Sequence, residues 1–272
     1  MYNTTPMQYL DHTFETPEEN LACDEAILDL CEEGMGPEIL RFWEPRSYFV
    51  VAGYSNKISS EVHVEECKKQ GIPILRRPSG GGTVLQGPGC LNYSLILKIE
   101  QRKEFETIRS ATCFIMETHA KALESIACHF EAEGREIPRQ RDLSSQKTLL
   151  EMTSKIQVQG TSDLTFNGLK FSGNAQRRKR TAFLFHGTFL LDFDLPMIEK
   201  TLAMPSRRPP YRKERSHKEF LTNLSISSNH IRKALAKTWR AEEKFGNEFL
   251  PLDQIRNLVR EKYSRREWNF KF

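Results

Sequence analysis

The sequence lacks the features that mark several common classes of protein. Its six cysteines include no Cys-x-x-Cys pair, and no set of cysteines and histidines has zinc-ligand spacing. No apolar run reaches the ~18 residues that a membrane-spanning helix needs, and the first residues do not resemble a signal peptide. We therefore expect no metal site, no membrane partner, and free thiols in a reducing, cytoplasmic environment.

Two common nucleotide-binding motifs are also missing. No Gly-x-Gly-x-x-Gly leads into a helix, and no Gly-x-x-x-x-Gly-Lys-Ser/Thr occurs. A strong excess of charge of either sign is also missing, because 40 basic against 36 acidic residues leave a formal net charge of only +4. That balance does not indicate nucleic-acid binding. Basic residues do cluster at 177–180 and 207–215. Solvated surface is the simplest interpretation of these clusters, and an acidic protein partner or a phosphate is the sharper one.

The most informative stretch that is present covers residues 76–94, with the sequence RRPSGGGTVLQGPGCLNYS. Three consecutive glycines weaken a packed element, but they let backbone approach a ligand closely or let amides converge on an anion. Arg76 and Arg77 could supply charge there, because arginine forks match carboxylate and phosphate geometry. The pattern predicts a strand, a glycine-rich turn and a strand that bind an anion. A simple hairpin whose glycines serve only the turn explains it equally well.

A second informative stretch covers residues 168–178, with the sequence GLKFSGNAQRR. Lys170 lies just after a tight turn, and the small residues Gly173 and Ala175 follow closely. A buried lysine is costly unless it meets an anion, and lysine is mostly exposed in proteins, so a solvent-facing side chain is one interpretation. The small residues favour the other, in which a ligand comes close to the lysine. His186 interrupts a later apolar run, where a satisfied core histidine is the commoner role.

The order of the patterns predicts an α+β fold, because helices and strands mix without regular βαβ alternation. Residues 139–156 are polar and weakly patterned and are expected to form a mobile loop, and 204–218 an irregular basic loop. The 104–130 helix should place Phe114, Ile115, Leu123 and Ile126 on its apolar side. Besides the glycine-rich hairpin, we expect helices at 16–33, 61–70, 104–130, 195–203 and 227–265, and strands at 38–43, 48–52, 162–166, 169–172 and 182–193.

These motifs together resemble the lipoate–protein ligase and octanoyltransferase family, which shares its catalytic domain with biotin protein ligases. The resemblance rests on residues 76–84, on 168–178 and on HGTFL at 186–190, with support from ENLACDE at 19–25. It covers roughly residues 8–225. It implies a central mixed β-sheet flanked by helices, of the biotin/lipoate ligase catalytic-domain type, over residues 1–226. A C-terminal helical extension, 227–272, would pack on this domain.

The resemblance also implies a catalytic lysine at position 170. In that family the motif lysine contacts the carboxyl and phosphate oxygens of an acyl-adenylate, where it would stabilise charge that develops during acyl transfer. The glycine turn would close over the acyl chain, and apolar strands would form its tunnel. The substrate-binding residues that the resemblance implies are Arg76, Arg77, Ser79, Gly80, Gly81, Gly82, Thr83, Asp163, Gly173, Ala175, His186, Gly187 and Thr188.

The sequence departs from the family pattern after the glycine turn. Gln86 and Gly87 stand where many ligases have His-Asp, and Cys90 stands where they often have Asn. In that family the octanoyltransferase branches carry the acyl group on a cysteine, which lies before the motif lysine in one branch and after it in another. Here the segment 160–163 before Lys170 has no cysteine, and none follows Cys128. Cys90 is the remaining nucleophile candidate, and a small buried strand residue is the commoner role for such a cysteine. A thioester route is therefore disfavoured.

The main functional expectation is a lipoate–protein ligase or lipoyltransferase that attaches a lipoyl group, through lipoyl-adenylate, to a lysine of an acceptor lipoyl domain. The acceptor would belong to a 2-oxoacid dehydrogenase or a glycine-cleavage type protein. Lipoate would be the substrate, with ATP and Mg²⁺ or preformed lipoyl-AMP. A separate accessory subunit could be needed, because 227–272 is too short for the accessory domain of the ligases.

Two alternatives stay open. The first is an octanoyl or lipoyl transferase that takes its acyl group from an acyl carrier or an acyl-protein donor. The second is a non-catalytic lipoyl-binding subunit. No nucleic-acid partner is expected under any of the three.

Overall fold

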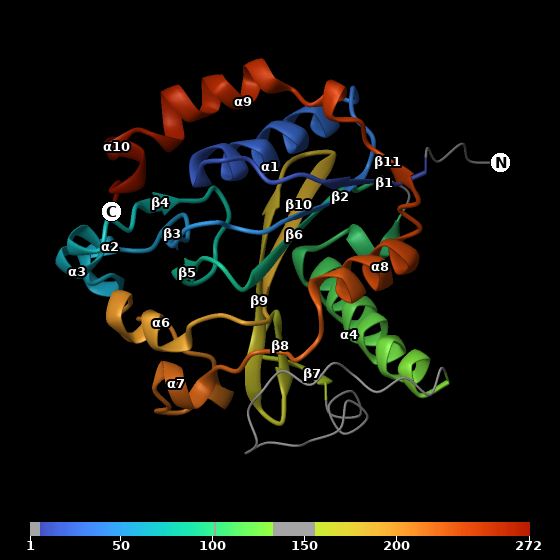
Figure 1. The fold of residues 1–272 in the computed structure, drawn as a ribbon. Coiled ribbons are helices and arrows are strands. Elements are labelled where there is room, and N and C mark those ends of the chain that lie inside the picture. Colours follow the sequence, from blue (N-terminus) through green and yellow to red (C-terminus); the bar gives the residue numbers. More distant parts are fainter. Residues whose placement is uncertain (1–5, 101, 133–155) are drawn as a thin grey trace.

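An eight-stranded mixed sheet forms the frame of the molecule (Figure 1). The structure is a computed structural model, and it describes residues 6–100, 102–132 and 156–272. β1 runs parallel to both of its neighbours, β2 and β11, whereas the other pairs are antiparallel. In sheet order the strands are β11 (Glu243–Lys244), β1 (Gln8–Asp11), β2 (Ile39–Trp43), β6 (Cys90–Lys98), β10 (Ala182–Leu190), β9 (Leu169–Arg178), β8 (Asp163–Phe166) and β7 (Ile156–Gln159).

A second, three-stranded sheet contains the strands on either side of the glycine-rich segment. Its order is β4 (Ile74–Arg76), β3 (Phe49–Ala52) and β5 (Val84–Gln86). β3 therefore lies between β4 and β5, and the expected glycine-rich hairpin is wrong. β4 and β5 each pair with β3 rather than with each other, because β3 offers N–H and C=O groups on both of its edges. Residues 77–83 form the connection that crosses β3.

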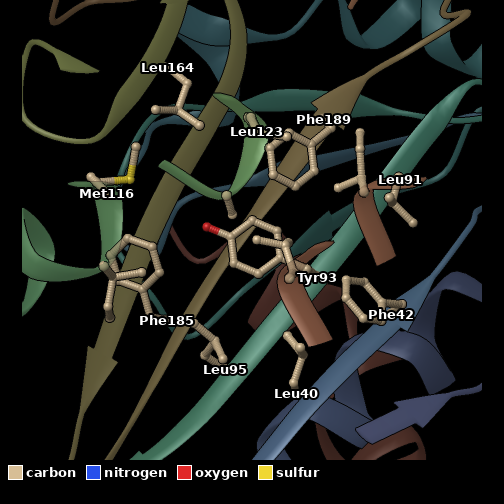
Figure 2. Close-up of a cluster of buried hydrophobic side chains, with 14 of the residues drawn as sticks. Leu40, Phe42, Leu91, Tyr93, Leu95, Met116, Leu123, Leu164, Phe185 and Phe189 are labelled. Atoms are coloured by element: carbon tan, nitrogen blue, oxygen red, sulfur yellow. The ribbon is translucent and has the colours of Figure 1, made fainter. Parts of the chain in front are cut away.

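Helices cover both faces of the large sheet (Figure 1), which confirms the predicted α+β class with a central mixed sheet. α1 lies over one face, and α4 and α8 lie over the other. Figure 2 shows part of the core on the α4 side, where Tyr93 of β6 packs among Phe185, Phe189 and Leu123. The helices are α1 (Pro17–Glu32), α2 (Ile58–Glu61), α3 (Val64–Lys69), α4 (Ile108–Ala132), α6 (Leu195–Thr201), α7 (His217–Phe220), α8 (Ser228–Trp239), α9 (Leu252–Leu258) and α10 (Arg266–Asn269).

The start of α1 confirms the expected capping signal. Thr16 Oγ1 accepts a hydrogen bond from the Glu19 amide, and the Glu19 carboxylate accepts one from the Thr16 amide. Pro17 occupies the first turn, where its missing N–H costs nothing. Because these contacts are local, the sequence alone predicts where this helix begins.

α4 confirms the predicted long helix with one correction. Ile115 and Leu123 are fully buried as expected, and Ile126 is buried as well. Phe114 is 39% exposed, so it lies at the margin of the apolar face rather than in the core. It still contacts the rings of Phe105 and Trp239. The loop expected over 139–156 lies outside the described residues, apart from Ile156, which begins β7.

The segment 227–265 is not continuously helical, which corrects the expectation. After α8 the chain forms β11, a 3-10 turn (Asn247–Phe249), α9 and a π-helical turn (Val259–Tyr263). β11 forms because β1 presents an unpaired edge, and the β1 strand itself was not predicted. The boundary predicted at residue 226 stays a prediction. In the part of the chain that the structure describes, every helix is too short or too polar to cross a membrane.

Candidate active site

A cavity of about 430 Å³ lies between the two sheets. One side of it is formed by the large sheet, from β2 across β6, β10 and β9 to β8. The other side is formed by β3, β5 and the glycine-rich loop, 77–83. α1 contributes Leu21 and Asp24 at one end, and α7 with the segment 203–212 borders the other end.

One row of paired residues runs along the large-sheet side of this cavity. Asp163 pairs with Gly173, Gly173 with Thr188, Thr188 with Asn92, and Asn92 with Trp43. Paired residues on adjacent strands point to the same face of a sheet. All five accordingly line the cavity, and their order gives the direction in which an elongated ligand would lie.

Lys170 lies at the Asp163 end of the row and faces the cavity. Its Nζ is 2.8 Å from Asp163 Oδ1, and only 24% of the lysine side chain is exposed. Tyr211 donates a 2.7 Å hydrogen bond to the other carboxylate oxygen, Oδ2. Burial and the neighbouring Asp163 raise the pKa of Tyr211, which keeps its proton on the phenol. Of the two interpretations of Lys170, the structure shows the one that faces the cavity.

Gly173 makes room for that lysine. A Cβ at this position would lie 2.7 Å from Lys170 Nζ and 2.8 Å from its Cε. Any larger residue would therefore displace the ammonium group. Of the small residues after Lys170, Gly173 thus serves the approach of the lysine itself to the sheet.

Arg77 shapes the glycine-rich loop from within. Its guanidinium donates to the carbonyl oxygens of Gly80 and Gly82, each at 2.7 Å, and to Val51 O at 3.2 Å. Burial lowers the pKa of Arg77 to about 10. Gly81 has a φ of +88°, a backbone conformation that favours glycine. Arg77 borders the cavity, but these bonds hold the loop rather than a ligand.

Arg76 points away from the cavity, because neighbouring residues of a strand face opposite sides. Its side chain is fully buried. One terminal nitrogen, Nη1, donates to the carbonyl oxygens of Gly53, Tyr54 and Asn56. This guanidinium therefore cannot contact a ligand in the cavity.

Ser79 and His186 form a pair beside the loop. Ser79 Oγ lies 2.6 Å from His186 Nε2 and accepts a hydrogen bond from Arg77 Nε. Burial, with a smaller contribution from Arg77, lowers the pKa of His186 to about 3, so its imidazole is neutral. His186 lines the cavity but Ser79 does not. The pair therefore ties the loop to β10 and does not present a serine nucleophile.

Cys90 lies apart from the cavity, in the apolar cluster that contains Leu190 and Phe193. Its side chain is 1% exposed, and burial raises the pKa of its thiol to about 12. A thiolate, which is the nucleophilic form, is strongly disfavoured there. Among the residues that the structure describes, no cysteine lines the cavity.

Most of the other predicted residues border the cavity. Gly187 is one of them, and it must be a glycine because a Cβ there would overlap the side chain of Asn174. The Asn174 Oδ1 accepts a hydrogen bond from the Tyr93 hydroxyl. The cavity-lining members of the predicted set are Arg77, Gly82, Thr83, Asp163, Lys170, Gly173, Ala175, His186, Gly187 and Thr188, whereas Arg76, Ser79, Gly80, Gly81 and Cys90 do not line it.

Glu61 is a cavity residue that sequence reasoning missed. Its carboxylate accepts hydrogen bonds from Asn56, Thr83 and Ser206 at 2.6–2.7 Å. Burial raises the pKa of Glu61, but the three hydrogen bonds outweigh it and leave the pKa below its ordinary value. Glu61 thus joins the glycine-rich loop to the 203–212 segment. Nothing in the local sequence signals this role, because two of its partners, Thr83 and Ser206, are 22 and 145 residues away in the chain.

Three arginines of the 203–212 segment line the cavity. Arg207 and Arg208 are exposed and Arg212 is buried, and all three belong to the expected basic loop. The structure adds a 3-10 turn (Pro210–Arg212) and the start of α7 to that loop. Among the described residues, no group of three or more His, Cys, Asp or Glu side chains is placed to hold a metal ion. The arrangement places Lys170 and these three arginines in the lining of one cavity.

Comparisons with known proteins agree over nearly the whole chain. The family model for the lipoyl protein ligase A/B catalytic domain matches residues 16–238. Octanoyltransferase LipM of Geobacillus kaustophilus is 27% identical over 286 residues, covering 97% of this chain and 98% of that protein. Octanoyltransferase LipM of Carboxydothermus hydrogenoformans is 29% identical over 278 residues, with the same two coverages of 97% and 98%.

Solved structures show the same fold. A crystal structure of lipoate-protein ligase A bound with ATP aligns with a TM-score of 0.69 at 25% identity, covering 97% of this chain and 98% of that one. A bipartite lipoate protein ligase from Thermoplasma acidophilum, described with its E2 lipoyl domain, aligns with a TM-score of 0.70 at 24% identity. It covers 98% of this chain and 96% of that one.

Proposed function

The chain belongs to the lipoyl protein ligase A/B catalytic-domain family, and from that premise we propose that it transfers an octanoyl or lipoyl group to a lysine of an acceptor lipoyl domain. The observation that carries the proposal is the position of Lys170. Its ammonium group is fixed by Asp163 at one end of an elongated cavity between the two sheets.

Lys170 would act on the acyl carbonyl group. A fixed ammonium beside the carbonyl oxygen stabilises the negative charge that develops when a nucleophile attacks. The nucleophile would be the amine of the acceptor lysine, so the enzyme itself would need to supply only position and charge. With a thioester donor, the new C–N bond forms, the C–S bond breaks, and the carrier leaves as a thiol with the proton from the amine.

The donor is the point on which the comparisons change the expectation. The sequence placed an ATP-dependent ligase first, but the curated relatives are octanoyltransferases over 97% of the chain. They support the alternative, in which an acyl carrier or an acylated protein supplies the group. We therefore place carrier-dependent transfer first, without a covalent enzyme intermediate, because Cys90 is buried away from the cavity.

Transfer from an acyl-adenylate is the second candidate. It is favoured by three cationic side chains that line the cavity, Lys170, Arg207 and Arg208. Such groups suit the oxygens of a phosphate. Lys170 and these arginines are the residues that would hold the phosphate of the adenylate, and the adenylate would supply an activated acyl group.

A transfer assay with three donors tests the proposal. The purified chain and a lipoyl domain are incubated with octanoyl-acyl carrier protein, with lipoate plus ATP and Mg²⁺, or with preformed lipoyl-adenylate. The mass of the acceptor domain is the readout. We expect modification from the carrier donor and its loss in Lys170→Ala. Modification from lipoyl-adenylate but not from lipoate and ATP would indicate that a separate subunit performs activation.

Two results would count against the proposal. Lipoate binding without transfer from any donor would favour the non-catalytic lipoyl-binding alternative. An acyl label retained on Cys90 would show that a covalent intermediate forms despite the burial of the thiol. If no such intermediate forms, a Cys90→Ala variant should transfer the acyl group as fast as the unaltered chain.

A further inference from the structure

Acyl transfer to an amine moves one proton, and the residues described so far leave that proton without a carrier. When the amine nitrogen bonds to the acyl carbon, it must lose a proton to become an amide nitrogen. With a thioester donor, the departing sulfur must gain one. Lys170 acts through the charge of its ammonium group, which pairs with Asp163, so it does not take up this proton. A positioned base speeds such a step, typically by about 10²–10⁴-fold.

Five side chains of the cavity lining carry a carboxylate or an imidazole within the described ranges, 6–100, 102–132 and 156–272. They are Asp24, Glu61, Asp163, His186 and His217. In the three carboxylates, each oxygen already accepts a hydrogen bond or an ion pair from a neighbouring side chain. His186 Nε2 is bonded to Ser79, and burial lowers the pKa of His186 to about 3, which makes it a weak base. His217 is the remaining candidate.

His217 holds one ring nitrogen in place and keeps the other free. It is the first residue of α7, and its Nε2 lies 3.2 Å from Ala203 O. A carbonyl oxygen can only accept, so Nε2 carries the ring proton and donates a hydrogen bond to that oxygen. The lone pair of the neutral ring is then on Nδ1, which has no hydrogen-bond partner in the part of the chain that the structure describes. Unlike the unpaired, fully buried Nδ1 of His119, it keeps accessible surface.

The ring of His217 is neutral at physiological pH, as a base must be. Burial lowers its pKa below 6.5, and the charges of Arg212 and Lys170 lower it further. The hydrogen bond with Ala203 and the carboxylate of Glu199, on α6, act in the opposite direction without restoring the ordinary value. A proton that is taken up near two cations is also given up readily, which suits a proton carrier.

α7 lies beside the strand that carries Lys170. Thr222 N donates to Lys170 O at 2.9 Å, and Leu221 pairs with Lys170 in a parallel bridge, where backbones are about 4.8 Å apart. Leu221 N donates to His217 O, so these two residues are one helical turn, about 5–6 Å, apart. An ammonium and a base that act on one carbon are on the order of 6–8 Å apart, because each is one hydrogen bond from an atom bound to that carbon. Because both side chains line the same cavity, Nδ1 and the ammonium group can take this spacing around one acyl carbon.

We propose that His217 is the general base of the acyl transfer and carries the proton of the acceptor amine to the leaving group. The amine nitrogen attacks the acyl carbon, the C–N bond forms, and an electron pair moves onto the carbonyl oxygen beside Lys170. Nδ1 of His217 takes the proton from the nitrogen. The C–S bond then breaks, the carbonyl double bond forms again, and the imidazolium returns the proton to the departing sulfur. The inference rests on the proposed function and adds a catalytic residue to it.

A variant at His217 tests this with the transfer assay. His217→Gln lacks a base, but its side-chain amide can still donate to Ala203 O and keep that contact of α7. We expect kcat/KM for the acceptor domain to fall about 10²-fold or more, whereas KM for the acyl donor and the melting temperature should stay unchanged. His63→Gln, at an exposed position outside the cavity lining, is the matched control and should transfer at the normal rate.

Added imidazole separates a lost base from a lost contact. In His217→Ala, imidazole from solution can take the place of the missing ring and should restore part of the rate, in proportion to its unprotonated form. It should not raise the rate of Lys170→Ala, which keeps its own base. A merely structural role of His217 would not respond to imidazole.

The pH dependence of kcat/KM gives a further readout, because it reports the ionisation of the free enzyme and the free acceptor. The acceptor amine, with a pKa of about 10.4, makes log kcat/KM rise with a slope of about 1 over the neutral range. Below the pKa of His217, which lies under 6.5, loss of the neutral imidazole should steepen the slope to about 2. His217→Gln should not show this extra steepening.

An unchanged rate in His217→Gln would overturn the inference alone. So would a loss of rate without imidazole rescue and with equal pH slopes in the variant and the unaltered chain, because His217 would then serve the fold. If the melting curve shows that His217→Gln does not fold, His217→Asn takes its place. No transfer by the unaltered chain from any of the three donors would overturn the proposed function, and the inference with it.

Discussion

Lys170 keeps its place through one ion pair, to Asp163, and through the absence of a side chain at Gly173. We expect Lys170→Ala to lower kcat/KM by about 10²–10³-fold, the usual cost of losing one stabilising group at a developing oxyanion. The fold should survive, because Asp163 keeps its hydrogen bond from Tyr211. The transfer assay and a melting curve measure both effects. Lys68→Ala, at an exposed position away from the cavity, is the control, and normal turnover of Lys170→Ala would remove the lysine from the mechanism.

Two glycines allow function and stability to be separated at the level of single residues. At Gly173 an added methyl group would overlap only the flexible end of Lys170, and it would touch Asp163 Oδ1 at an ordinary 3.7 Å. Gly173→Ala should therefore reduce transfer strongly while changing the free energy of unfolding by less than about 1 kcal/mol. Kinetics and urea unfolding on the same preparation measure the two quantities.

Gly89→Ala is the matched comparison. There the φ is +88°, and the new methyl group would overlap backbone atoms of Asp192 and Phe193, which cannot rotate away. We expect a loss of at least about 1–3 kcal/mol in the free energy of unfolding. Equal destabilisation by Gly173→Ala and Gly89→Ala would show that Gly173 serves the fold rather than the position of Lys170.

Among the elements, β4 depends on a segment far away in sequence. It is an outer strand of the small sheet, and its free edge would otherwise present unpaired backbone groups. Trp268 Nε1 donates to Arg76 O at 2.8 Å, and Arg76 N donates to Asn269 Oδ1 at 3.0 Å. Two side chains of α10 thus take the place of a neighbouring strand.

This contact predicts an effect of α10 on the glycine-rich loop, which begins directly after β4. Asn269→Ala should lower the free energy of unfolding by about 1–3 kcal/mol, because it leaves the buried Arg76 amide unpaired. It should also raise KM for the acyl donor, since the loop loses support. Urea unfolding and steady-state kinetics test this, with exposed Glu267→Ala as control. An unchanged stability would mean that water replaces the Asn269 oxygen.

Local signals explain which elements the sequence predicted. α1 was correctly placed because Thr16, Pro17 and Glu19 interact with one another. β11 could not be predicted, because Glu243 and Lys244 have no strand pattern and form a strand only against the edge of β1. The hairpin failed for a similar reason. Residues 74–86 look like a hairpin locally, but β3, from an earlier part of the chain, inserts between its arms.

The residues of the candidate site also fall into two groups, those that a sequence motif marks and those that only the fold brings to the site. Lys170, Gly173 and Thr188 lie in motifs, so a resemblance could point to them before the structure placed them at the cavity. Tyr211 and Glu61 lie in segments without a motif, and only the fold brings Glu61 to the cavity and Tyr211 to Asp163. Asn92 is the intermediate case, because it belongs to the 76–94 stretch and could have been singled out there.

At the scale of the whole molecule, two buried histidines make stability depend on pH. Burial lowers the pKa of His119 and of His186 to about 3, from 6.5. In the unfolded chain they take up protons below about pH 6.5, whereas in the folded chain they stay neutral until about pH 3. The stability they permit is thus complete above pH 6.5 and is lost as the pH falls from 6.5 toward 3.

His119→Gln tests this dependence. His119 is fully buried and accepts a hydrogen bond from Trp239 Nε1, which an amide oxygen can also accept. Between pH 7.5 and 5 the unaltered chain should lose up to about 2 kcal/mol of unfolding free energy through this histidine, and the variant should not. Urea unfolding at the two pH values measures the difference. Exposed His63→Gln should behave like the unaltered chain, and identical losses in all three would exclude His119 as the cause.

β1 is among the first segments that the ribosome makes, whereas its partner β11 is among the last. Gln8 and Glu243 lie 235 residues apart. At about 5–20 residues per second, the outer edge of β1 waits roughly 10–50 s for its partner. The glycine-rich loop and Lys170 have been synthesised well before then. A nascent chain stalled short of β11 would therefore hold the glycine-rich loop and Lys170 and yet expose an open sheet edge, on which neighbouring nascent chains could aggregate.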